Sequence, residues 1–134
     1  MWAASDLEPI LVGDGPGAAS ALKMAYAAWT KGTSALLLGV HALAAAEGVH
    51  EPLLEEWGRS QPELERRSDG ARRGAVPKAW RFAGEMEEIA DSFAAADLPD
   101  GFHRAAAAIY RELADFKDAD PAPELDDILD RLRT

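Results

Sequence analysis

Residues 16–47 read PGAASALKMAYAAWTKGTSALLLGVHALAAAE, and this stretch decides the fold. Only Gly32 and Gly39 interrupt it, and apolar or aromatic residues recur along it at helical spacing. A helix of about 32 residues spans roughly 48 Å, which is long for a small domain. The stretch therefore predicts one long central helix, with Gly48 as its C-terminal stop.

The second half of this helix, residues 35–46, is apolar almost all round. Such a helix must be covered on every side, and a chain of 134 residues can hardly supply that cover. We therefore expect an intertwined homodimer, in which the long helix, residues 16–47, packs against a partner copy. The most apolar run has about 13 residues, fewer than the ~20 that a bilayer requires, so we expect no membrane span.

The remaining segments predict shorter helices over residues 50–59, from 62 onward, over 77–96 and 100–116, and from 123. Residues 68–74 are polar, basic and interrupted by glycine, and we expect them to be mobile. The pattern predicts a single all-α domain, a helical bundle around one long central helix. Its parts are an extended lead-in with a brief strand (1–14), a helical core (15–118) and an acidic C-terminal helix (119–134).

Charge and composition argue against several classes of partner and site. The formal net charge of −10 argues against nucleic acid and anionic membranes as partners. The absence of cysteine excludes disulfides and thiolate metal sites, and favours the reducing cytoplasm. His41, His50 and His103 are far apart and lack metal-ligand spacing, so we expect no metal. His41, in the apolar helix, is expected to be a core histidine with its hydrogen bonds satisfied.

Lys23 is a candidate for acid–base chemistry. It lies about two turns into the long helix, among Ala, Leu, Met and Tyr residues. Poor solvation and the positive end of the helix both favour a neutral amine there. Lys23 shares a face with Tyr26 and Thr30. The alternative, which the residues alone favour, is a lysine whose ammonium reaches solvent.

A basic stretch between Arg59 and Arg81 holds seven basic and three acidic residues. Trp80 and Arg81 could form a clamp for a phosphate or carboxylate. The alternative is a solvated loop that keeps an acidic protein soluble. We favour that alternative for four arginines of the stretch, namely Arg66, Arg67, Arg72 and Arg73.

The glycines at 13, 15 and 17 superficially imitate a dinucleotide-binding fingerprint. That fingerprint needs a second strand after the helix and an acidic residue about 20 positions on. Here residues 34–46 continue as helix. The glycines therefore predict a turn and a helix start, whose exposed N–H groups can hold a carboxylate or phosphate.

The run GPGAASALKM, residues 15–24, followed by a long helix, resembles the opening of the C-terminal domain in the 3-hydroxyisobutyrate and 6-phosphogluconate dehydrogenases. WRFAGEMEEIA (80–90) and LPDGFH (98–103) extend the resemblance, which covers about residues 7–118 and is closest to a bacterial branch of undefined substrate. It implies an all-helical domain that dimerises through its long helix. It also implies NAD or NADP, bound mostly by an N-terminal Rossmann domain that we do not expect in this chain.

The resemblance also implies roles for individual residues. Lys23 falls on the position of the family's acid–base lysine, which serves the substrate hydroxyl. The family places asparagine, or histidine and asparagine, three and four residues later, where this chain has Tyr26 and Ala27. Tyr26 is therefore predicted to donate instead. The predicted catalytic residues are Lys23 and Tyr26, and the predicted substrate contacts are Gly15, Gly17, Thr30, Trp80 and Arg81.

Two functions of different classes follow. The first is the substrate-binding and dimerisation domain of an NAD(P)-dependent oxidoreductase, acting on a hydroxyacid-like small substrate and inactive without a Rossmann cofactor domain. The alternative is a stand-alone helical dimer that serves as a non-redox binding or assembly module. A non-redox lyase or isomerase around Lys23 ranks last, because no second polar catalytic group is evident.

Overall fold

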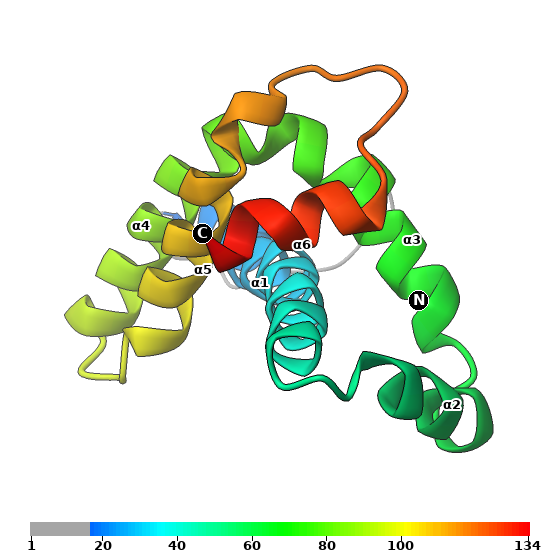
Figure 1. The fold of residues 1–134 in the computed structure, drawn as a ribbon. Coiled ribbons are helices and arrows are strands. Elements are labelled where there is room, and N and C mark those ends of the chain that lie inside the picture. The colour runs from blue at the N-terminus through cyan, green and yellow to red at the C-terminus, as the bar shows by residue number, and fades with distance from the viewer. Residues whose placement is uncertain (1–16) are drawn as a thin grey trace.

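The computed structural model describes residues 17–134, so the predicted lead-in (1–14) and Gly15 lie outside the described residues. The described part is all-helical and contains no strand (Figure 1). Its elements are α1 (Ala18–Ala46), α2 (His50–Ser60), α3 (Leu64–Gly74), the 3-10 turn η2 (Val76–Lys78), α4 (Ala79–Ala95), α5 (Gly101–Glu112), the 3-10 turn η3 (Ala114–Phe116) and α6 (Leu125–Arg133). The predicted all-α bundle is confirmed.

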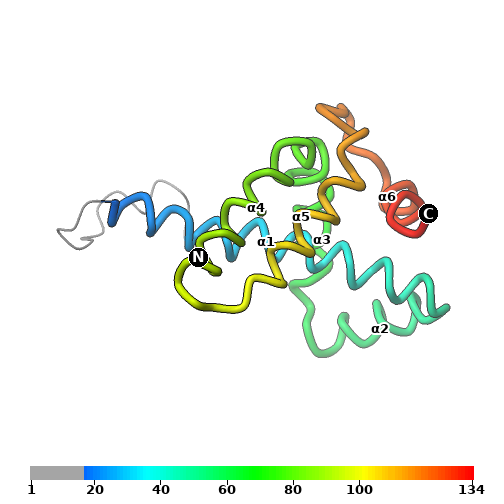
Figure 2. Tube along the Cα trace, turned by 90° about the vertical axis from the view of Figure 1, so that its left-hand side faces the viewer, coloured from blue at the N-terminus to red at the C-terminus, as the bar shows by residue number. Residues whose placement is uncertain are grey.

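The long helix α1 has 29 residues and agrees with its predicted bounds to within two residues at each end. Gly17 precedes it at φ 82° and Gly48 follows it at φ 73°, both in the left-handed region that favours glycine. The first turns of α1, in blue, project beyond the other helices (Figure 2). The rest of α1 runs through the bundle, which makes it the central element.

The core forms where α4, α5 and α6 pack on α1. Tyr110 of α5 is fully buried, donates its hydroxyl hydrogen to the carbonyl oxygen of Lys31 in α1, and meets the Phe82 ring edge-on at 5.5 Å. Lys31 itself pairs with Glu85 of α4. Several other side chains are fully buried around this contact, namely Leu38, Val76, Met86, Leu113 and Ile128.

The expectation that residues 68–74 are mobile is wrong, because they form most of α3. Two of them, Ser68 and Ala71, are buried, and α3 packs against α1. On the outer face Asp69 accepts hydrogen bonds from Arg72 at 2.9 Å and Arg73 at 2.8 Å, the spacing that stabilises a helix surface. Burial and these ion pairs offset the glycines that the sequence analysis read as helix breakers.

Gly32 and Gly39, the two interruptions of the long helix, both face α5. A Cβ at Gly32 would lie 3.0 Å from Nε2 of His103, and one at Gly39 would lie 3.2 Å from Cδ1 of Ile109. The same His103 Nε2 donates to the carbonyl oxygen of Ala28 at 3.0 Å. The glycines therefore let α5 approach α1 closely.

We predict that Gly32→Ala destabilises the chain by about 1–3 kcal/mol, because the new methyl group displaces the buried His103 ring. Gly70→Ala is the matched control: nothing lies within 4 Å of a Cβ there. That helical position should gain about 0.5–1 kcal/mol. Urea unfolding measures both, and an equal gain in the two variants would contradict the close approach of α5.

Candidate functional site

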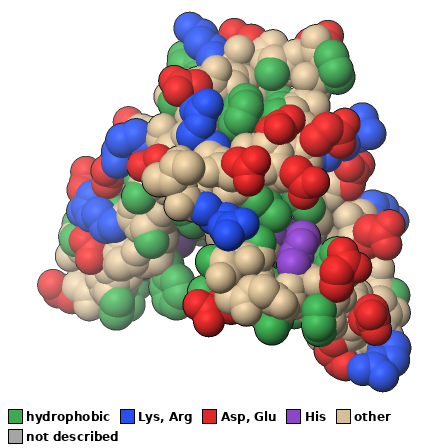
Figure 3. Space-filling view, in the orientation of Figure 1, with side chains coloured by type: hydrophobic (Ala, Val, Ile, Leu, Met, Phe, Trp, Pro, Cys, Tyr) green, Lys and Arg blue, Asp and Glu red, His purple; other side chains and the backbone are tan. Residues whose placement is uncertain are grey.

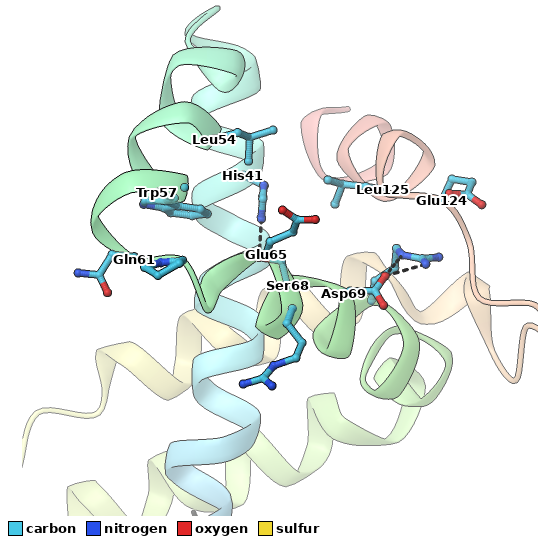
Figure 4. Close-up of a pocket in the computed structure, with 13 residues that line it drawn as sticks. His41, Leu54, Trp57, Gln61, Glu65, Ser68, Asp69, Glu124 and Leu125 are labelled. Atoms are coloured by element: carbon cyan, nitrogen blue, oxygen red, sulfur yellow. Dashed lines mark hydrogen bonds and ion pairs between the residues drawn. The ribbon is translucent and has the colours of Figure 1, made fainter.

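A cavity of about 810 Å³ opens between α2, α3 and the start of α6 (Figure 4). Leu54 and Trp57 of α2 form one wall, and Leu125 of α6 lies opposite. His41 of α1 and Ser68 of α3, which are 2% and 9% exposed, lie at its inner end. A volume of this size matches the cavities that hold small ligands.

His41 is at the centre of a hydrogen-bonded chain across three helices. Its Nε2 lies 2.9 Å from Oγ of Ser68, and its Nδ1 lies 2.8 Å from Nε2 of His50. The Trp57 ring meets the imidazole edge-on at 5.3 Å. The predicted satisfied core histidine is confirmed. The expectation that the histidines are far apart is wrong for His41 and His50, because the turn at Gly48 folds α2 back beside α1.

Burial, and to a lesser degree the nearby His50, together lower the pKa of His41 from 6.5 to about 4. His41 is therefore a neutral imidazole at pH 7. The inner end of the cavity is polar but carries no charge. In the space-filling view, histidine side chains show in purple in a hollow of this face, among scattered acidic and basic groups (Figure 3).

Arg72 is one of the four arginines that the sequence analysis assigned to a solvated loop, and for Arg72 this is wrong. Its side chain is only 13% exposed. It pairs with Asp69 at 2.9 Å and donates to the carbonyl oxygen of Pro123 at 3.0 Å. The hydrogen bonds from Arg72 and Arg73 hold the pKa of Asp69 below its ordinary value. Arg72 thus ties the segment before α6 to α3 and helps to position Leu125.

The predicted catalytic residues lie elsewhere. Lys23, Tyr26 and Thr30 share one face of α1, near the end that projects from the bundle (Figure 2). Lys23 is exposed in the single chain, as expected for the solvated lysine that the residues alone favour, so this copy does not desolvate its amine. Gly17 lies directly before α1 in its left-handed conformation, and no side chain of residues 17–134 caps the helix start. Gly15 lies outside the described residues.

Trp80 and Arg81 begin α4 and are both exposed. The Lys117 ammonium lies 4.4 Å from the centre of the Trp80 ring, and the Arg81 guanidinium lies 5.9 Å from the centre of the Phe82 ring. The 810 Å³ cavity is lined by other residues. None of the predicted site residues among residues 17–134 lines this cavity.

A second hollow, an apolar groove of about 600 Å³, runs between α1 and α5. Its lining includes Trp29 and Leu36 of α1, together with Phe102. These three side chains are 64%, 58% and 79% exposed, and Leu43 further along α1 is 63% exposed. Exposed apolar side chains gathered in this way are typical of surfaces that bind another molecule.

In residues 17–134, no helix is long and apolar enough to cross a membrane. No group of three or more histidine, aspartate or glutamate side chains among them is arranged to hold a metal ion.

Comparison with known proteins identifies the family. A family model described as a domain of unknown function, DUF1932, matches residues 44–113, just over half of the chain. This domain is found in the C-terminal helical region of β-hydroxyacid dehydrogenase-like proteins. No curated protein and no solved structure matches the chain significantly. The match runs from the end of α1 into the residue that follows α5, and the chain is a member of the DUF1932 family.

Proposed function

We propose that this chain is the substrate-binding and dimerisation domain of a cytoplasmic NAD(P)-dependent oxidoreductase that acts on a hydroxyacid-like small substrate. Membership of DUF1932 supports the assignment to a dehydrogenase C-terminal region. The all-helical bundle around α1 supports it as well. The domain is inactive alone, because most of the dinucleotide is bound by a Rossmann domain on the same or a separate chain.

The observation that carries the proposal is the apolar stripe on α1, which consists of Trp29, Leu36 and Leu43. These residues are seven apart, so they lie on one line along the helix and span about 21 Å. All three are more than half exposed. A second copy of the chain packed along α1 removes the stripe and the adjoining groove from water, which is the driving force for dimerisation.

Lys23 and Tyr26 form the acid–base part of the proposed site. Lys23 holds the proton of the substrate hydroxyl, and Tyr26 donates to the substrate where the related dehydrogenases use asparagine. The bound NAD(P) supplies hydride transfer. The start of α1 after Gly17, which no described side chain caps, suits a negatively charged group, because the first N–H groups of a helix have no partner within the helix. Thr30, Trp80, Arg81 and the turn at Gly15 complete the proposed substrate contacts.

Sedimentation equilibrium tests the dimerisation part. The chain has a mass of 14.4 kDa, and we expect twice this mass at micromolar concentration. A chain that is still monomeric at about 100 μM, a concentration at which even weak dimers form, would contradict the proposed dimerisation.

The redox part is tested by Lys23→Ala in the presence of the cofactor domain. We expect kcat to fall by about 10²–10⁴-fold, the usual contribution of an acid–base group. Lys78→Ala, at another exposed lysine, is the matched control and should leave turnover unchanged. Unchanged turnover in the Lys23 variant would remove the dehydrogenase role.

A further inference from the structure

The 810 Å³ cavity is separate from the proposed dehydrogenase site. His41, at its inner end, lies 18 positions after Lys23 on α1, which corresponds to about 27 Å along the helix. The proposed hydroxyacid chemistry uses none of the residues that line it. A ligand bound in this cavity would therefore be distinct from the hydroxyacid-like substrate.

Some of the charged side chains that line the cavity have ion-pair partners within the described part of the chain, and others do not. Arg72 and Asp69 satisfy each other, and Arg72 also binds carbonyl oxygens before α6. Three charged lining residues remain, namely Glu65, Arg66 and Glu124. Their sum is one negative charge.

Glu65 is the charge best placed for a ligand. Its carboxylate points into the space between His41 and Leu125 (Figure 4). Among residues 17–134 it has no hydrogen bond or ion pair, and the neighbouring Arg66 is exposed and likewise unpaired. The neutral His41 ring adds no positive charge that would compete for this carboxylate.

We propose that this cavity binds a small organic amine. Its ammonium group pairs with the carboxylate of Glu65, and its apolar part lies against Trp57, Leu54 and Leu125. The indole ring of Trp57 attracts a cation held near its face. Ser68 Oγ, which shares one hydrogen with His41, keeps a lone pair that can accept from an N–H of the amine.

Three probes that share one ring and differ in charge test the proposal on the full chain at pH 7. The probes are benzylamine, benzyl alcohol and benzoate. Their binding is measured by calorimetry and by quenching of tryptophan fluorescence. An ion pair with a cation–π contact is worth about tenfold in Kd, so benzylamine should bind about tenfold more tightly than benzyl alcohol. Benzoate should bind most weakly. The proposal would be overturned by equal affinities of the three probes or by tighter binding of benzoate. It would also be overturned if benzylamine does not bind at 10 mM, roughly the limit of a weak specific site.

Two variants locate the site. Glu65→Gln keeps the shape of an exposed side chain, so the fold is preserved, and it should reduce the preference for benzylamine over benzyl alcohol to about twofold or less. Glu63→Gln is the matched control, because Glu63 is also exposed at the start of α3 but does not line the cavity. It should keep the full preference. An unchanged preference in the Glu65 variant, or an equal loss in both, would place the amine elsewhere and refute the assignment.

Discussion

Leu36→Glu is expected to convert the proposed dimer into a monomer. Leu36 lies at the middle of the apolar stripe on α1, between Trp29 and Leu43. In a symmetric dimer the substitution removes two buried leucines, each worth about 1.5–3 kcal/mol, and introduces two carboxylates into an apolar contact. We expect Kd for self-association to rise by roughly a thousandfold or more, which is about 4 kcal/mol.

The monomeric variant should keep its fold, because Leu36 is 58% exposed in the single chain and makes no part of its core. Circular dichroism checks this, and sedimentation velocity from about 1 to 200 μM measures the association. Val49→Glu is the matched control, since Val49 is an exposed apolar residue (47%) outside the stripe. A Leu36 variant that dimerises as tightly as the Val49 variant would show that α1 does not form the interface.

The helices could be predicted from the sequence because their signals are local. The periodicity of α1 and the glycines at its two ends act within a few residues, so the predicted bounds agree closely with Ala18–Ala46. The expectation that residues 68–74 are mobile was wrong because tertiary packing, rather than local sequence, stabilises this part of α3. The burial of Ala71 against α1 cannot be read from a polar, glycine-containing segment.

The same distinction explains the site. His41, His50 and Ser68 lie on three helices, and only the fold brings them within hydrogen-bonding distance. One signal was present: a histidine inside an apolar helix needs buried partners. The sequence does not say which residues they are. Lys23, Trp80 and Arg81 are exposed in the single chain, and they and the other predicted site residues stay predictions.

Acid should destabilise the chain through His41. The imidazole has a pKa of about 4 when folded, against 6.5 as its ordinary value. Between these values the unfolded chain binds a proton that the folded chain does not, so stability is highest above pH 6.5 and is lost as the pH falls towards 4. The loss amounts to about 2 kcal/mol by pH 5 and about 3 kcal/mol once the folded form also titrates.

His41→Gln isolates this effect. The variant should be less stable than the natural chain at pH 7.5, since the hydrogen bonds to Ser68 and His50 are disturbed, but its stability should change little between pH 7.5 and 5. Urea unfolding at several pH values in this range measures both slopes. Carboxylates with a lowered pKa, such as Asp69 and Glu87, lose their contribution only as the pH falls below their ordinary range, so they do not confuse the comparison.

Equal slopes in the two proteins would mean that His41 is not held neutral by burial. In that case the inner end of the amine cavity would carry a positive charge near pH 6, and benzylamine would lose its advantage over benzyl alcohol as His41 titrates. With His41 neutral, the advantage should persist at pH 5.5, well above the folded pKa of about 4. Because the Trp57 ring meets His41 at 5.3 Å, the pH-dependent fluorescence change that Trp57→Phe removes should follow the same protonation.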